Sequence, residues 1–241
     1  MTRKENKGYK GARSEKKFYG WHVVVLSSIT GALTAPGQSI GISVFREPMA
    51  EELMLSDTAI STAYLVGTII ASLFLPRIGR WVDKTGVKIT GLLIVAGFSA
   101  ALAHMSLVNN IFWLSLGFIG IRALGQGALS LVSRVSIVHW FEAKRGFAIG
   151  VSMTLSTAGM SLLPLLLSLS ISRWGWRNSW IFASLGVLMI ATPIIWFGFV
   201  NKPEDLGQEV DGGKKNSLKE IRESPIAVEK KEVIRSRSFW L

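Results

Sequence analysis

The chain has 241 residues, of which 49% are hydrophobic, with a mean hydropathy of +0.38 and a formal net charge of +11. It contains no cysteine, which excludes disulfides and thiolate metal sites. Its apolar residues gather in long unbroken blocks, whereas a soluble domain would distribute them at the period of a helix or a strand. The composition therefore predicts an all-α membrane protein.

Six apolar stretches follow a basic segment along the chain. All sixteen acidic residues lie outside them, and each stretch is long enough, at about 1.5 Å per residue, to cross roughly 30 Å of hydrocarbon. The stretches are 22–45, 58–78, 89–107, 111–138, 146–171 and 178–200. We expect a basic tail at 1–20, a six-transmembrane-helix bundle at 21–200 and a linker at 201–241. Because Phe239-Trp240-Leu241 directly follows basic residues, we expect this linker to end at the start of a seventh span.

The basic residues are unevenly distributed between the two ends of the expected bundle. Of 27 Lys and Arg, 22 lie in the two tails and in the loops at 77–88 and 139–146, and only Arg46, Arg173 and Arg177 belong to the opposite side. By the positive-inside rule, both termini are cytoplasmic in a multi-pass protein of the cell membrane. Since the lipid bilayer explains the charge, we do not expect a nucleic-acid partner.

Two pentapeptides are similar in expected spans one and four. They are Ala35-Pro36-Gly37-Gln38-Ser39 and Ala123-Leu124-Gly125-Gln126-Gly127, and each glutamine lies at a similar depth in helices of opposite direction. This is the pattern of a 3+3 inverted repeat, although three identities in five residues also arise by chance in helices rich in Gly and Ala.

The loop between expected spans two and three carries a recognisable motif, Gly79-Arg80-Trp81-Val82-Asp83-Lys84-Thr85-Gly86-Val87-Lys88. It resembles the signature loop of the major facilitator superfamily, and Arg122 with its glycine-rich turn resembles that superfamily's second motif. Three further segments are similar to the monocarboxylate and oxalate/formate branch. They are Trp140-Phe141 with Lys144-Arg145-Gly146, Gly175-Trp176-Arg177, and Pro203-Glu204-Asp205-Leu206-Gly207.

The resemblance implies a bundle of major facilitator type, proton-coupled transport and relatives with twelve spans in two halves. The chain is similar to an amino-terminal half, so its implied partners are a small organic anion, a proton, and a missing carboxy-terminal half or a second copy. The implied mechanism is alternating access around a midplane site. The alternatives are a truncated non-transporting membrane protein or sensor, and a six-span transporter that works as a homodimer.

Arg122 is the principal candidate for substrate binding or coupling. It lies 11 residues into the fourth stretch, near the bilayer midplane, where a guanidinium keeps its charge and needs an anion or several acceptors. Because none of the six stretches contains Asp or Glu, the acceptor is a substrate, a group in another half, or an amide such as Gln126. Gln38 and Tyr64 belong to polar stripes that line a cavity or join helices. A helix cross-link is the alternative role for Arg122.

The signature loop also predicts a conformational latch. Two glycines, Gly79 and Gly86, permit a tight reversal, and Asp83 can accept hydrogen bonds from a helix terminus or pair with a nearby cation. Arg134 is placed near the same surface, which makes it a candidate partner for Asp83. Lys84 and Lys88 complete the motif. The alternatives are a solvated loop and an arginine that extends to the membrane interface.

Enzyme chemistry is not expected. Residues 37–41 match Gly-x-Ser-x-Gly, but that motif works between a strand and a helix, and here it lies within a membrane span. His22, His104 and His139 are placed at different ends of the bundle, which argues against a metal site. We expect no cofactor and no metal.

Overall fold

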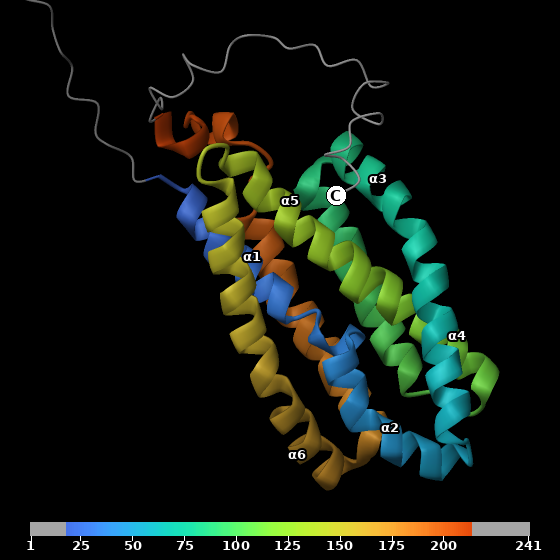
Figure 1. The fold of residues 1–241 in the computed structure, drawn as a ribbon. Helices are drawn as coiled ribbons and strands as arrows, with labels where there is room; N and C mark the ends of the chain where they lie inside the picture. Colours follow the sequence, from blue (N-terminus) through green and yellow to red (C-terminus); the bar gives the residue numbers. More distant parts are fainter. Residues whose placement is uncertain (1–17, 214–241) are drawn as a thin grey trace, which may run out of the picture.

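The computed structural model describes residues 18–213, and in this part of the chain all regular secondary structure is helical (Figure 1). The elements are α1 (Gly20–Ala32), η1 (Ala35–Gly37), α2 (Ser39–Leu53), α3 (Asp57–Met105), α4 (Ile111–Ile121), η2 (Arg122–Leu129), α5 (Ser130–Trp140), α6 (Arg145–Pro193), η3 (Ile194–Gly198), η4 (Pro203–Leu206) and η5 (Val210–Gly213). The expected basic tail up to residue 17 and the expected seventh-span entry lie outside the described residues.

Three helical stretches have the length and apolar composition to cross a membrane, namely Asp57–Met105, Ile111–Trp140 and Arg145–Gly198. The expected first span is divided into α1, η1 and α2, because Pro36 and the extended residue Gln38 (φ −104°, ψ 166°) interrupt the helix. Interrupted helices within membranes are tolerated where other helices surround the break.

Helices α3 and α6 each have 49 residues and each contains one non-helical glycine. Gly86 has φ 82° and ψ 165°, and Gly175 has φ 78° and ψ 163°, a conformation that only glycine adopts readily. A straight helix of this length would extend for about 74 Å, more than twice the hydrocarbon thickness. Figure 1 shows that each helix turns back at its glycine, so that its two legs run in opposite directions.

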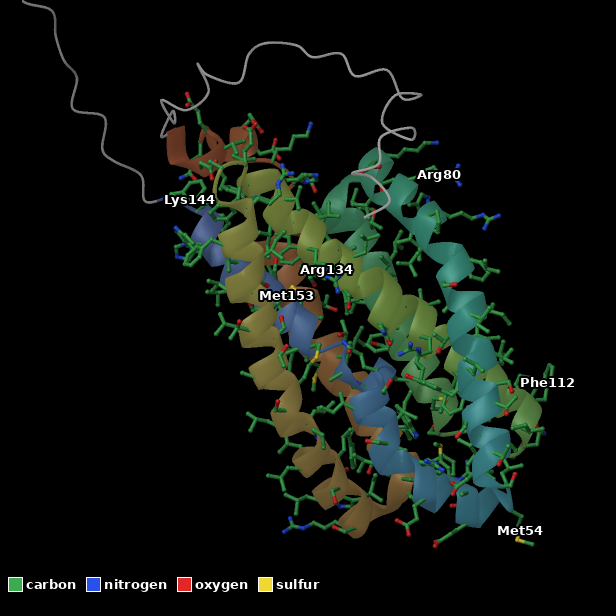
Figure 2. All side chains as sticks on the ribbon, in the orientation of Figure 1. Met54, Arg80, Phe112, Arg134, Lys144 and Met153 are labelled. Carbon is green, nitrogen blue, oxygen red and sulfur yellow. The ribbon has the colours of Figure 1, made fainter. Side chains whose placement is uncertain are left out.

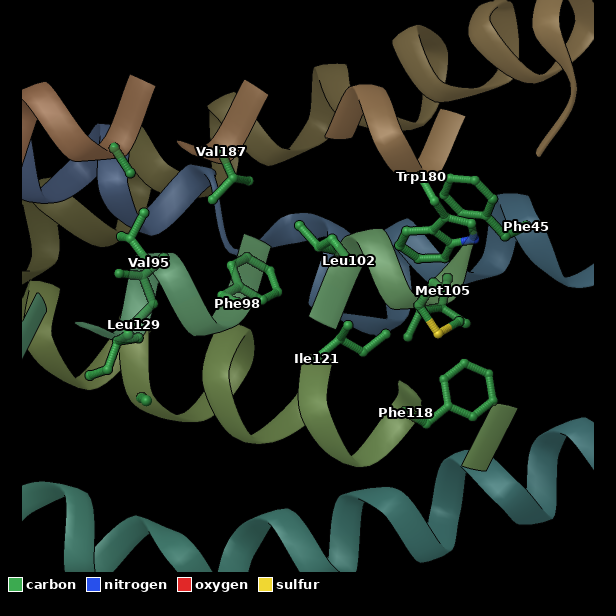
Figure 3. Close-up of a cluster of buried hydrophobic side chains, with 14 of the residues drawn as sticks. Phe45, Val95, Phe98, Leu102, Met105, Phe118, Ile121, Leu129, Trp180 and Val187 are labelled. Atoms are coloured by element: carbon green, nitrogen blue, oxygen red, sulfur yellow. The ribbon is translucent and has the colours of Figure 1, made fainter. Parts of the chain in front are cut away.

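Large apolar side chains fill the centre between α2, α3, α4 and α6. The ring of Phe45 stacks on that of Trp180 with centroids 3.9 Å apart, and Phe98, Leu102 and Phe118 are fully buried beside them (Figure 3). Lipid tails are as apolar as these side chains, so close packing rather than the exclusion of water favours this arrangement in a membrane.

Small and hydroxylated residues join α1 to the first leg of α6. Ser28 Oγ donates to Ser152 Oγ over 3.1 Å, and Ser156 Oγ donates to the Ser28 carbonyl over 2.9 Å. A Cβ atom at Gly31 would lie 2.6 Å from Ser156 Oγ. The short side chains therefore allow the two backbones to approach closely.

The interruption at η1 packs against η2, a segment of π-helix. A Cβ atom at Gly37 would lie 2.5 Å from the carbonyl oxygen of Ile121, and one at Gly125 would lie 2.4 Å from the ring of Phe98. The same ring lies 3.1 Å from the Cβ position of Gly37. The two similar pentapeptides thus provide the irregular segments that meet in the middle of the bundle.

The segment at 199–213, here named the tail strap, crosses the end of the bundle at which both described termini lie (Figure 1). Its Asn201 side chain accepts from the Lys88 backbone N–H over 3.2 Å. The Asn201 carbonyl lies 3.0 Å from His139 Nδ1. Further along the strap, Gln208 Oε1 accepts from the Tyr19 backbone N–H over 2.9 Å.

Asp211 binds the far end of the tail strap to the rest of the bundle. Its Oδ2 atom accepts from the backbone N–H groups of Glu142 and Ala143 over 3.2 and 2.7 Å. These donors belong to the connection between α5 and α6. The packed structure therefore extends beyond the last apolar stretch, whose predicted end is residue 200.

Candidate functional site

Arg122 lies at the junction of α4 and η2 and is only 8% exposed. Its Nε atom donates to Thr68 Oγ1 over 2.9 Å, and its guanidinium carbon lies 4.7 Å from the ring centroid of Tyr64. Its Nη1 atom is buried and has no hydrogen-bond partner within residues 18–213. The site is therefore a buried cation whose Nη1 group makes no hydrogen bond, and an anion is the acceptor that such a group prefers.

The π-helix places this cation beside the central break. π-Helical turns are rare in proteins, and a large share of those that occur lie at functional sites. A Cβ atom at Gly127 would lie 3.0 Å from Leu75 Cδ1 and 3.4 Å from the Arg122 carbonyl oxygen, so η2 packs closely against α3 here. Gln126 is exposed, and the structure has no hydrogen bond from it to Arg122. Thr68, rather than the amide suggested by the sequence, is the acceptor beside Arg122.

Tyr64 lies on α3, and Gln38 lies between η1 and α2. Tyr64 Oη is 2.7 Å from Ser39 Oγ, at the start of α2. Gln38 Nε2 donates to Thr34 Oγ1 over 2.7 Å, which bridges the interruption between α1 and α2. Tyr64 therefore contacts the cation directly, whereas Gln38 hydrogen-bonds to Thr34 in its own span.

A row of polar residues on α3 extends from this site toward the start of the helix, where α2 packs against it. These residues follow helical spacing and share one face, namely Asp57, Ser61, Tyr64 and Thr68. At the far end Arg46 Nε is 2.9 Å from Asp57 Oδ1. Two hollows of about 590 and 330 Å³ lie beside this ion pair and are lined by both helices.

A family model, described as Major Facilitator Superfamily, matches residues 27–241. The chain belongs to the major facilitator superfamily. Its curated relatives include human monocarboxylate transporter 14, which is 26% identical over 66% of this chain and 32% of the human protein. The oxalate:formate antiporter of Oxalobacter formigenes is 25% identical over 61% of this chain and 34% of the antiporter. The riboflavin transporter RibJ of Trypanosoma brucei brucei is 24% identical over 70% and 32%.

The matched region is thus about a third of the length of these curated relatives. They are transporters rather than enzymes, and members of the superfamily are integral membrane proteins that move small molecules. The helical structure, with its long apolar helices, agrees with membership of this family.

The signature loop of this superfamily member surrounds the kink at Gly86. Asp83 and Arg134 (Figure 2) are both exposed, and no ion pair joins them in the described structure. Lys84 is exposed, and Gly79 lies beside Leu131 of α5. The latch role of these residues stays a prediction.

Asn201 is the contact of this loop that sequence reasoning missed. A Cβ atom at Gly86 would lie 2.8 Å from Asn201 Oδ1, and the Lys88 backbone N–H donates to that same oxygen. The Lys88 ammonium lies 5.4 Å from the ring centroid of Trp196. The only available signal was the position of Asn201 directly after the last apolar stretch.

No group of three or more His, Asp or Glu residues that could hold a metal ion occurs within residues 18–213. His104 lies 3.1 Å from the Trp113 carbonyl, and His139 lies against the tail strap. His104 and His139 thus contact neighbouring helices and connections, and His22 stacks on the ring of Tyr19.

Proposed function

We propose that this chain forms half of a secondary active transporter for a small organic anion, such as a monocarboxylate, coupled to a proton. The observation that carries the proposal is the free Nη1 donor of buried Arg122. Placing an arginine at the centre of a bilayer costs about 2.5–3.5 kcal/mol on insertion scales. The ion pairs of the described residues, Arg46–Asp57 and Arg177–Glu52, do not include Arg122. An anionic substrate would supply the missing acceptor.

The proposed architecture has six spans related by a 3+3 inverted repeat. An interrupted helix followed by a bent helix of 49 residues occurs twice, first as α1, η1, α2 and α3 and then as α4, η2, α5 and α6. In Figure 1 the first interrupted helix runs away from the tail strap and the second runs toward it. This antiparallel arrangement supports an inverted repeat, and both termini are proposed to be cytoplasmic in the cell membrane.

A second six-helix body would complete the site. In alternating access one bundle rocks against another around a midplane site, and a single bundle provides only one wall. The share of the relatives that is matched supports this proposal, with either six further spans or a second copy as the partner. A non-transporting membrane protein or a sensor is the alternative.

Uptake by the full-length protein in reconstituted vesicles tests the proposal, with labelled L-lactate and oxalate as probes. Arg122→Gln should abolish carboxylate binding without preventing membrane insertion. Arg122→Lys should restore only part of it, because an ammonium lacks the planar fork of the guanidinium. Arg173→Gln is a matched control, since Arg173 is exposed far from the site.

The outcomes separate the possible roles. If Arg122→Gln binds carboxylates normally but loses the response to a pH gradient, Arg122 serves coupling rather than binding. Normal binding and normal coupling in this variant would leave only the helix cross-link and refute its functional assignment. If the unaltered protein neither binds nor transports either probe, the proposed substrate class is wrong.

A further inference from the structure

Tyr64 makes two contacts at once, and they belong to different parts of the molecule. Its ring lies 4.7 Å from the guanidinium carbon of Arg122, which is within the range of a cation–π contact. Its hydroxyl lies 2.7 Å from Ser39 Oγ, on the first residue of α2. The side chain that covers the cation is therefore tied to the helix that begins directly after the central break.

We infer that Ser39 is a positioning residue, which holds Tyr64 over Arg122 and thereby selects how an anion approaches. The inference rests on the proposed function. The Nε side of the guanidinium is occupied by Thr68, and one face is covered by the Tyr64 ring. The remaining buried donor is Nη1. A carboxylate must then bind end-on, at the edge formed by the two Nη atoms, rather than side-on through Nε.

End-on binding restricts the shape of the substrate. A carboxylate bound at the Nη edge lies in the guanidinium plane, while the Tyr64 ring prevents approach to the covered face. Compact carboxylates satisfy this geometry, whereas a bulky group beside the carboxylate would displace Tyr64. The hydroxyl pair of Ser39 and Tyr64 therefore favours small planar anions.

The position of Ser39 also links the anion site to α2. Gln38, immediately before it, is extended and separates α2 from the preceding helix. If α2 changed its direction relative to α1, Ser39 would be the first helical residue to move. Neighbouring hydroxyls lack this arrangement, since Ser43 donates to the carbonyl of Ile40 within its own helix. A movement of α2 would break the bond between Ser39 and Tyr64 and uncover Arg122.

Equilibrium binding of labelled oxalate and L-lactate to the full-length protein provides the first test. Ser39→Ala and Tyr64→Phe each remove one partner of the same hydrogen bond, so each should weaken oxalate binding by a similar factor of about two to twelve. The double variant should be no weaker than either single one. Ser39→Thr should bind normally, and so should the control Ser115→Ala, whose hydroxyl bonds within its own helix to Ile111.

A second measurement does not depend on substrate. The chain contains no cysteine, so Ile40→Cys gives a single reactive thiol on α2. Its rate of maleimide labelling should rise equally in the Ser39→Ala and Tyr64→Phe backgrounds and stay unchanged in Ser115→Ala. If the unaltered protein binds neither probe, the proposed function fails, and the labelling rates alone decide whether Ser39 holds Tyr64. Additive losses of affinity, or labelling rates that do not change, would overturn the positioning role.

Discussion

Glu52, at the end of α2, joins three parts of the bundle at the end opposite the tail strap. Its carboxylate accepts from Arg177 Nε over 2.8 Å and from Trp176 Nε1 over 2.5 Å. Arg177 also donates to the Ser106 carbonyl, just after α3, over 2.7 Å. Glu52→Gln should loosen the contact between α2 and the kink at Gly175.

The expected magnitude is set by exposure, because the Glu52 side chain is 51% exposed and that of Arg177 is 35% exposed. An exposed ion pair contributes about 0.2–1 kcal/mol, since solvent and salt screen it. The amide oxygen of glutamine can still accept from the Trp176 indole, so the substitution removes the ion pair and only weakens that bond, which is worth about 0.5–1.5 kcal/mol. We expect Glu52→Gln to cost roughly 0.5–1 kcal/mol, which corresponds to a fall in melting temperature of about 1–4 °C.

The effect should depend on pH in a defined direction. The hydrogen bond from Arg177 lowers the pKa of Glu52 from its ordinary 4.5, with a smaller opposing contribution from burial and a further lowering by Trp176. A carboxylate with a lowered pKa stabilises the folded state fully above its unfolded pKa and loses that contribution as the pH falls through the folded value. The difference between the variant and the unaltered protein should be constant from about pH 6 to 8 and shrink below pH 4.5.

Thermal unfolding of the detergent-solubilised full-length protein, followed by size-exclusion chromatography across this pH range, measures the difference. Glu51→Gln is the matched control, because the neighbouring carboxylate is exposed and takes part in neither ion pair. Equal melting temperatures for Glu52→Gln and the unaltered protein at pH 7 would refute the reasoning. An equal loss in Glu51→Gln would refute it as well.

Two further predictions concern orientation and the signature loop. Lys84 and Glu47 are both exposed, and each is replaced in turn by a single cysteine. The cysteine at position 84 should react with an impermeant maleimide only from the cytoplasm, and the cysteine at position 47 only from outside. The reverse pattern would invert the proposed topology. Asp83→Asn in the full-length protein should slow transport while equilibrium binding of oxalate stays within a few-fold, because Asp83 lies in the signature loop, away from Arg122. A parallel loss of binding and transport would contradict the latch role of Asp83.

Local patterns in the sequence identified the features whose causes are local. The apolar stretches predicted the helices, and the depth of Arg122 in its stretch predicted a buried cation. Gly79 and Gly86 predicted a reversal, which occurs at Gly86, whereas Gly79 is helical. The separation of the first span into α1, η1 and α2 was not expected, although its cause is local because Pro36 interrupts a helix. These features depend on residues that are adjacent or a few turns apart.

The partners of the candidate site depend on contacts between distant residues. Thr68 is 54 positions from Arg122, and no periodicity within one helix connects the two. Gln126 was the natural candidate because it lies four residues away on the same span, yet it makes no hydrogen bond to the cation. Asn201 was not predicted either, because its contact with Lys88 spans 113 positions.

The tail strap determines how a mechanical load would enter the bundle. A force applied at residue 213 would not act on α6 alone. It would be transmitted through Asp211 to the connection after α5, through Gln208 to the start of α1, and through Asn201 to the bend in α3. A domain attached after residue 213 would therefore pull on several helices together. The helix ends at this side of the bundle would then move as one rigid unit.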